Sequence, residues 1–338
     1  MREQSAWCLA NIAGDGAEMR DIVLRSGALQ PLLKNIQQPA NLSLLRNTVW
    51  ALSNFCRGKP QPPFGTMAAA LPILGDVLNQ EDKEVLMDAC WATSYLSDGS
   101  KEQIDAINEA RIIWRLVQLL SHKCPSVVTP ALRTIGNIVS GDDNQTQTAI
   151  DAGCLHAVPP LLEHMKKGIR KEACWMLSNI AAGNQNQITI LLQCQEVIDA
   201  VLTRLIYDDW DVRKEAAWVI FNLATGGTHE QVFALIRNHR CIEPLCSLLA
   251  VSDSKILHVA LDTLEALLKC DYRSSGLLQV SASIDAVDGL EKIEALQEHQ
   301  DEAVYGKAVR LIETHFGDEA KHPTESLADS SFHLGSYS

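Results

Sequence analysis

Apolar positions recur with helical spacing along most of the chain, in segments that come in pairs. Residues 152–165 (AGCLHAVPPLLEHM) precede residues 169–183 (IRKEACWMLSNIAAG), and residues 239–249 precede residues 256–268 in the same way. Apolar residues three and four positions apart line one face of a helix, so each segment is predicted to be helical. The alternation and two-residue turns expected of a β-propeller do not occur in the sequence. The pattern predicts an all-α protein.

A pair of residues four positions apart marks the second helix of each unit. The pairs are Trp7/Asn11, Trp50/Asn54, Trp91/Tyr95, Arg133/Asn137, Trp175/Asn179 and Trp218/Asn222. Their first members are 41 to 43 residues apart, which gives a period of about 42 residues. That period lies in the range of HEAT and armadillo repeats, and shorter repeat families are excluded. Repeats of this size bury their apolar faces by stacking, so one continuous solenoid is expected.

The repeat pattern also sets the expected boundaries. We expect a right-handed superhelical armadillo-repeat solenoid of about seven to eight repeats over residues 1–316, with an incomplete first repeat and a capping last repeat. Residues 317–338 are expected to form a disordered tail. A glycine four residues after the asparagine position is expected to provide a left-handed C-terminal cap. These glycines are Gly58, Gly99, Gly141, Gly183 and Gly226.

Composition and charge narrow the possible functions. The chain has 29 Lys and Arg against 42 Asp and Glu, a net charge of −13, which disfavours nucleic acid and anionic membranes and favours a basic partner. The ten cysteines show no CxxC spacing and lie in apolar segments, which predicts reduced core thiols and a cytosolic or nuclear protein. No apolar stretch is long enough to span a membrane. The sequence contains no catalytic or metal-binding motif in its required context, so neither an enzyme nor a metal or other cofactor is expected.

The tryptophans and asparagines of successive repeats are predicted to form a ladder. The tryptophans either pack the core or line a binding face, and the asparagines favour the second interpretation. Burying an unpaired amide would cost a few kcal/mol in every repeat. An exposed asparagine can bond an extended peptide backbone, and neighbouring indoles suit the stem and charge of Lys or Arg. Acidic residues near the tryptophans, Asp15, Glu172 and Glu215, would hold the positive ends. The predicted ligand is an extended basic peptide.

Several segments resemble consecutive armadillo repeats of the importin α family. They are WCLANIAGDG, WALSNFCRGKPQPP, ACWATSYLSDG, ALRTIGNIVSGDD, KEACWMLSNIAAGN and KEAAWVIFNLATGGTHEQ, and the resemblance covers roughly residues 1–318. It implies a nuclear import adaptor of the cytoplasm and nucleus. Such an adaptor binds lysine/arginine-rich nuclear localisation signals of cargo proteins in a concave Trp/Asn groove for importin β-dependent import. The alternative is a truncated paralogue, or an armadillo scaffold that binds partners without delivering them.

The resemblance also implies site residues. Motif matching places part of the family's major peptide site at Trp7, Asn11, Asp15, Trp50 and Asn54. It places the minor site at Arg133, Asn137, Val139, Gly141, Thr146, Glu172, Trp175, Ser178, Asn179, Glu215, Trp218 and Asn222. Phe221 stands where small residues are usual in the family, and it either crowds the minor site or packs inward.

The resemblance carries expectations about protein partners as well. The family uses an Arg/Lys-rich N-terminal segment to bind importin β and to cover its own groove, and this sequence does not contain that segment. We therefore expect constitutive cargo binding without recruitment of importin β. The stretch from Gly289 to Phe316 is expected to serve an exportin, as in the family.

Two short segments have competing interpretations. The acidic stretch from Asp208 to Asp211 lacks the spacing of a calcium loop and is predicted to cap the following helix. The segment from Lys59 to Pro63 is either a polyproline ligand or a rigid inter-helix loop, and the loop is the commoner use of such a sequence.

Overall fold

The computed structural model describes residues 1–317, and α-helices with short 3-10 helices account for all regular structure in that range. The chain divides into two compact units, Met1–Gln231 and a second unit that begins at Val232. The division falls within α18 (His229–Asn238). Residues 318–338, almost all of the predicted tail, lie outside the described residues. Within residues 1–317, no helix combines the length and apolarity needed to cross a bilayer.

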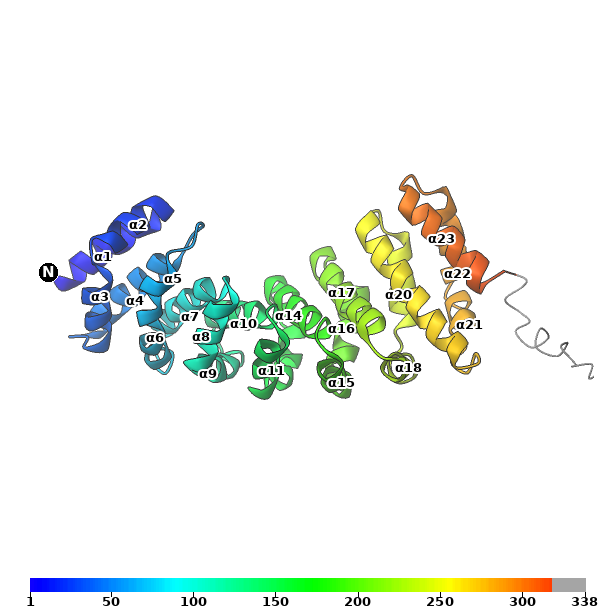
Figure 1. Cartoon of the computed structure of the whole chain (residues 1–338), viewed down its shortest axis with the longest axis horizontal. Coiled ribbons are helices and arrows are strands. Elements are labelled where there is room, and N and C mark those ends of the chain that lie inside the picture. Colours follow the sequence, from blue (N-terminus) through cyan, green and yellow to red (C-terminus); the bar gives the residue numbers. More distant parts are fainter. Residues whose placement is uncertain (318–338) are drawn as a thin grey trace, which may run out of the picture. The chain divides into compact units, whose positions relative to one another are not determined.

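The first unit contains six long helices that follow one another in chain order (Figure 1). They are α1 (Arg2–Gly14), α4 (Leu42–Cys56), α7 (Lys83–Ser97), α10 (Pro125–Val139), α14 (Lys167–Ala181) and α17 (Trp210–Gly226). Each packs against the next one in this series. These are the helices that carry the Trp/Asn pairs, so the all-α prediction and the 42-residue period are both confirmed.

Shorter helices connect the long ones and complete each repeat. They are α2 (Ala17–Arg25), α3 (Leu29–Gln37), α5 (Phe64–Met67), η1 (Ala68–Ala70), α6 (Leu71–Val77), α8 (Lys101–Glu109), α9 (Ile112–Leu119), α11 (Asp143–Asp151), α12 (Cys154–Ala157), α13 (Pro159–Leu162), α15 (Gln185–Gln193) and α16 (Gln195–Tyr207). The helix predicted over residues 152–165 is divided into α12 and α13, because Pro159 and Pro160 lack the N–H groups that a continuous helix needs.

The second unit contains the remaining elements, again with one long helix. They are α19 (Ile242–Cys246), η2 (Ser247–Ala250), α20 (Ser254–Arg273), α21 (Val280–Asp285), α22 (Gly289–Ala295), η3 (Leu296–Glu298) and α23 (Glu302–His315). The helix predicted over residues 256–268 lies inside α20 and packs on α23.

The repeats share an apolar core that contains most of the cysteines. On α14, Ile169, Ala173 and Leu177 are almost fully buried. Burial contributes about 25 cal/mol per Å² of apolar surface, so this core supplies most of the stability. Burial also raises the pKa of the Cys90 thiol to about 12, which keeps it protonated at neutral pH. The prediction of core thiols is confirmed for Cys56, Cys90, Cys154, Cys174, Cys241, Cys246 and Cys270, which are buried and form no disulfide.

The glycines after the ladder helices differ from the prediction. Only Gly58 has a positive φ, of 103°, so the predicted left-handed cap is wrong for the other four. At Gly99, Gly141 and Gly183 the reason for glycine is steric. A Cβ there would lie 1.9 to 2.1 Å from the side-chain oxygen of a glutamine four residues further along. At Gly226, which ends α17, a Cβ would make only an ordinary contact.

These glutamines form a second ladder, which we call the glutamine ladder. Each side-chain oxygen accepts a hydrogen bond from the backbone N–H of the helix N-cap residue. The nitrogen of Gln187 then donates to the carbonyl of Asp143 in the preceding repeat at 2.7 Å, and that of Gln145 donates to the carbonyl of Lys101 at 3.0 Å. The ladder therefore ties consecutive repeats together through buried polar groups. Its members are Gln103, Gln145, Gln187 and Gln231.

The segment from Lys59 to Pro63 is a loop held at several points. The fully buried guanidinium of Arg20 donates to the carbonyls of Arg57 at 2.7 Å and Pro60 at 2.8 Å. Gln61 donates to the carbonyl of Tyr95 at 3.0 Å. These bonds favour the interpretation as a rigid inter-helix loop.

Candidate functional site

The ladder tryptophans lie on consecutive long helices and keep part of each ring accessible. Trp7 on α1 is 54% exposed. Trp50, Trp91, Trp175 and Trp218 are half-buried on α4, α7, α14 and α17. An indole in this state is anchored by the core and still presents aromatic surface to a ligand.

The ladder asparagines bind the preceding helix, which corrects the expectation that they are exposed. Asn54 is 7% exposed, and its Nδ2 donates to the carbonyl of Ala10 at 3.0 Å. Asn137 is 9% exposed and donates to the carbonyl of Ser94 at 3.2 Å. The expectation is wrong at both positions because a carbonyl of the preceding helix satisfies the amide, so its burial carries no penalty.

Asn222 shares this bond to the preceding long helix but is less buried, and Asn11 and Asn179 lack the bond. Asn222 is half-buried and donates to the carbonyl of Ser178 at 2.8 Å. Asn11 is exposed and donates to the carbonyl of Trp7 on its own helix. Asn179 is half-buried, and its Nδ2 has no hydrogen-bond partner among the described residues. The Nδ2 atom is itself buried, so it does not face a ligand in this structure.

Other residues expected in the minor site lie beneath the surface. Val139, Thr146 and Ser178 have buried side chains, and Thr146 Oγ1 donates to the carbonyl of Val139 at 3.2 Å. Gly141 is exposed. Ser178 contributes its carbonyl, the acceptor for Asn222. The side chains of Val139, Thr146 and Ser178 therefore pack under the ladder surface and are not exposed to a ligand.

Glu172 already has a partner within the chain. Arg133 donates to it from Nε at 2.5 Å and also from Nη2, so the pair is bidentate. The same guanidinium lies 5.7 Å from the centroid of the Trp175 ring. Glu172 was expected to pair with a positive charge of the ligand. That expectation is corrected, because the guanidinium of Arg133 already pairs with the Glu172 carboxylate.

Glu215 occupies the same repeat position three residues before Trp218, but it is unpaired. Among the described residues its half-buried carboxylate has no salt bridge or hydrogen bond. Burial raises the pKa of Glu215, and the charges of Lys171 and Glu172 on α14 also act on it. A carboxylate in this state gains most from a cation, because the cation compensates its lost hydration.

A third carboxylate at this repeat position was not anticipated. Asp88 lies three residues before Trp91 on α7, and burial together with the charge of Glu84 raises its pKa to about 7. The sequence did contain a signal for Asp88. An acidic residue stands three positions before tryptophan in MDACW (residues 87–91), as it does in KEACW (171–175) and KEAAW (214–218). Asp15, the acidic residue expected after Asn11, is exposed at the end of α1.

Two aromatic pairs modify the ladder. Trp91 and Tyr95 are stacked with ring centroids 5.7 Å apart, so the tyrosine that replaces asparagine extends the aromatic surface of α7. Phe221 meets Trp218 edge-on at 5.2 Å and 85°. Phe221 is half-buried, so it does not turn fully into the core. Its ring instead becomes part of the aromatic surface at Trp218.

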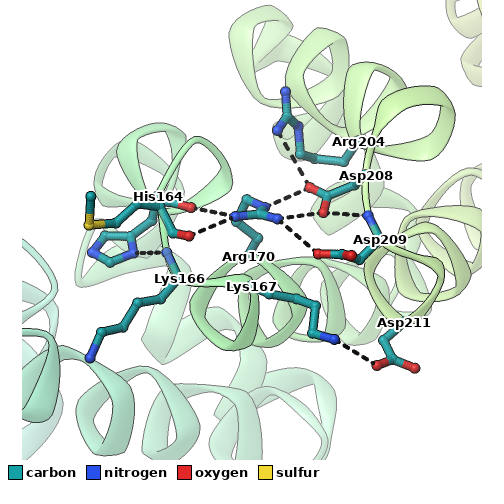
Figure 2. Close-up of polar contacts among 9 residues, drawn as sticks. His164, Lys166, Lys167, Arg170, Arg204, Asp208, Asp209 and Asp211 are labelled. Carbon is teal, nitrogen blue, oxygen red and sulfur yellow. Dashed lines mark hydrogen bonds and ion pairs between the residues drawn. The ribbon is translucent and has the colours of Figure 1, made fainter.

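A buried ion pair joins Arg170 near the start of α14 to Asp208, which lies between α16 and α17. Figure 2 shows Arg170 of α14 between the carbonyl of His164 and the carboxylate of Asp208. Arg170 donates from Nε and Nη2 to the two Asp208 oxygens, each at 2.6 Å. The Asp208 side chain is 1% exposed.

The acidic stretch from Asp208 to Asp211 therefore does not act as predicted. Asp209 is the N-cap residue of α17 but makes no side-chain capping bond. Asp208 instead binds Arg170, with Arg204 as a second cation 3.4 Å away. Burial tends to raise the pKa of Asp208, but the hydrogen bonds from Arg170 and the Asp209 N–H hold it below its ordinary value.

Taken together, the ladder residues offer two features to a ligand. They are half-exposed indoles and unpaired carboxylates. These features suit the stem and charge of a lysine or arginine on an extended chain. Within residues 1–317, no group of His, Cys, Asp and Glu side chains is arranged to hold a metal ion.

Family models identify the repeats. The model described as Armadillo/beta-catenin-like repeat matches residues 16–57, 100–140 and 142–182. The model described as Atypical Arm repeat matches residues 279–330. These matches confirm the predicted armadillo-repeat solenoid.

Comparison with known proteins extends this result. Importin subunit alpha-1b of Oryza sativa subsp. japonica is 45% identical over 99% of this chain, which spans 64% of that relative. A designed armadillo repeat protein in complex with the peptide (KR)4 is 31% identical, with a TM-score of 0.64 over 72% of this chain and 98% of its own. Importin subunit alpha-7 of Arabidopsis thaliana is 44% identical over 94% of this chain, which spans 70% of that relative. Similarity of this extent to importin alpha subunits, in a chain built of armadillo repeats, shows that the protein belongs to the importin alpha family.

Proposed function

We propose that this chain binds lysine/arginine-rich nuclear localisation signals of cargo proteins and acts as a nuclear import adaptor. The observation that carries the proposal is the surface formed by Trp175, Glu215 and Trp218, which we call the α14/α17 step. Its two indoles are half-exposed, and its carboxylate has no partner among the described residues.

The chemistry of this step favours a cation on a long apolar stem. A lysine or arginine stem packs on the indoles, and its charge reaches Glu215. The net charge of −13 adds long-range attraction for a basic peptide. The designed armadillo protein with a bound (KR)4 peptide supports the same ligand class.

A second binding region is proposed in the N-terminal repeats. It consists of Trp7, Asn11, Asp15, Trp50 and Asn54, the part of the major site indicated by the sequence resemblance. The exposed indole of Trp7 and the exposed carboxylate of Asp15 provide the same pair of features as the α14/α17 step.

The partners of the whole pathway are part of the same proposal. In the family, cargo of this class travels between cytoplasm and nucleus through importin β, which residues 1–338 are not expected to recruit by themselves, and we propose α22 and α23 as the surface for an exportin. These two helices lie in the stretch from Gly289 to Phe316, with η3 between them. Co-purification of the chain with cargo peptide and each receptor in turn tests these assignments one at a time.

The central test is a fluorescence-anisotropy titration of labelled (KR)4 against the full chain. We expect a Kd in the micromolar range or tighter, weakening as salt rises because the contacts are ionic. The double variant Trp175→Ala/Trp218→Ala should weaken binding by at least about 30-fold, since buried aromatic contacts dominate such interfaces.

The matched control is Trp114→Ala, which removes a tryptophan that is 47% exposed on α9, outside the ladder. This variant should bind (KR)4 like the parent chain. A folded parent chain that binds (KR)4 no better than an acidic peptide of equal length would contradict the proposed function.

A further inference from the structure

Arg133 stands where other repeats have tryptophan, and its guanidinium is engaged inside the protein. It contacts both carboxylate oxygens of Glu172 and lies 5.7 Å from the Trp175 ring centroid. We call the surface of Arg133, Glu172 and Trp175 the α10/α14 step. A carboxylate beside an aromatic ring is the environment that the proposed function assigns to a ligand cation.

The α10 side of Trp175 is closely occupied. A Cβ on Gly136 would lie 2.3 Å from the Trp175 ring, so the six-membered part of the indole rests on the glycine backbone. Gly136 and Arg133 lie three residues apart on α10, on the same face of the helix. The indole therefore rests on α10 with the guanidinium beside it. The Glu172 side chain is only 14% exposed beneath this pair.

The equivalent carboxylates in other repeats are not occupied in this way. Glu215 before Trp218 and Asp88 before Trp91 have no ion pair or hydrogen bond from a described residue. Of the three carboxylates at this repeat position, Glu172 alone is neutralised within residues 1–317. The difference follows from a single residue, because Arg133 is the arginine among the first members of the repeat pairs.

We propose that Arg133 is an internal occupant of the α10/α14 step and thereby determines which step of the ladder accepts a ligand cation. It fills the position of a basic side chain at Glu172 and Trp175. A ligand cation therefore binds at steps whose carboxylates are unpaired, among them the α14/α17 step with Glu215. This inference rests on the proposed function, since it concerns the same surface and the same basic ligand.

Removal of the guanidinium should open the closed step. In Arg133→Ala, Glu172 becomes an unpaired carboxylate, and the ring of Trp175 loses its internal cation. A ligand with successive basic residues then gains one more carboxylate and aromatic contact. We expect Arg133→Ala to bind (KR)4 about tenfold more tightly than the parent chain, the effect of one additional cation contact of this kind.

The test is the (KR)4 titration with the parent chain, Arg133→Ala and Arg133→Ala/Glu172→Gln. If the gain comes from the freed Glu172, adding Glu172→Gln should reduce it to within about threefold of the parent chain. Arg25→Ala is the matched control, because Arg25 is exposed on α2 and its loss changes the net charge equally. The control should change the Kd by less than about twofold.

Two further measurements make the outcome decisive. Thermal unfolding followed by circular dichroism shows whether each variant is folded, and Arg133→Gln provides a milder variant that retains a hydrogen-bond donor to Glu172. A parent chain that binds (KR)4, with folded Arg133 variants that bind it equally or more weakly, overturns this inference and leaves the proposed function intact. A folded parent chain that does not bind (KR)4 contradicts the proposed function itself.

Discussion

Gly136 and Trp175 fit together without room for a methyl group, because a Cβ on the glycine would lie 2.3 Å from the indole ring. The contact joins α10 to α14 and fixes the orientation of the ring on the ladder surface. Trp175 of α14 therefore requires a glycine at position 136 of α10, and a larger residue there would change the orientation of the Trp175 ring.

Gly136→Ala should displace the Trp175 indole. Forcing extra volume into a packed contact costs about 1–3 kcal/mol of folding free energy, and we expect (KR)4 binding to weaken at least fivefold as the ring moves. Titration and urea unfolding measure the two effects. Gly168→Ala on α14 is the control, because a Cβ there meets nothing within 4 Å. Equal (KR)4 affinity in both variants would show that the orientation of Trp175 is unimportant.

Asn54→Ala should destabilise the first unit. The substitution removes the buried hydrogen bond from Asn54 Nδ2 to the Ala10 carbonyl, which joins α4 to α1, and the net contribution of such a bond is about 0.5–1.5 kcal/mol. Asn11→Ala is the matched change in the preceding repeat, where the amide is exposed and bonds its own helix. It should cost less than about 0.5 kcal/mol. Urea unfolding midpoints of the two variants test the difference, and equal midpoints would rule out a structural role for the Asn54 amide.

Asp208→Asn should be strongly destabilising because it removes the buried bidentate partner of Arg170 and leaves only Asp209, 3.5 Å away and exposed. Breaking a buried ion pair from one side typically costs about 3–5 kcal/mol. The control is Asp98→Asn, which removes the partner of Lys59 in a pair whose side chains are 66% and 61% exposed. Exposed pairs contribute less than about 1 kcal/mol. Thermal unfolding at neutral pH compares the two variants.

The same ion pair predicts a pH dependence. The pKa of Asp208 is below its ordinary value, so its stabilising contribution is complete above the unfolded value of about 3.9 and is lost as pH falls through the native value. Acid unfolding of the parent chain should therefore be steeper than that of Asp208→Asn. Parallel acid transitions would contradict this assignment.

Asp88 predicts a second pH dependence near neutrality. Its pKa of about 7 means that the carboxylate is largely neutral at pH 6 and ionised at pH 8. Affinity for a basic peptide should rise about threefold to tenfold over that range and should rise less in Asp88→Asn. The native state also binds this proton more tightly than the unfolded chain, so Asp88 destabilises the fold progressively as pH rises from about 4 through 7.

Asp76→Asn, an exposed carboxylate on α6, is the control for the Asp88 experiment. It should retain the pH dependence of the parent chain in the (KR)4 titration. A parent chain whose affinity is constant between pH 6 and pH 8 would exclude Asp88 from the binding surface.

Local sequence patterns predicted the helices and the repeat, because helical periodicity and a 42-residue period are properties of single segments. They could not predict the partners of individual polar side chains. Asn54 has the same local sequence context as an exposed asparagine would, yet the carbonyl of Ala10, 44 positions away, satisfies it. Glu172 is unavailable because Arg133 of the previous repeat reaches it. Such pairings depend on the packing of neighbouring repeats.

The glycines after the ladder helices illustrate the same limit. A glycine at a helix end usually indicates a left-handed cap, and Gly58 follows that rule. Gly141 instead provides space for the side chain of Gln145. The aligned glutamines were visible in the sequence, but their role became clear only from the hydrogen bonds to the preceding repeat.

The glutamine ladder gives the solenoid a direction. At Gln145, Gln187 and Gln231 a rung is a donor on one repeat and a carbonyl on the repeat before it, as between Gln187 and Asp143. If the earlier repeat unfolds, the later one keeps a buried donor without an acceptor. If the later repeat unfolds, the earlier one exposes only a carbonyl, which water satisfies readily. Fraying should therefore propagate more easily from the N-terminal end of the ladder than from its C-terminal end.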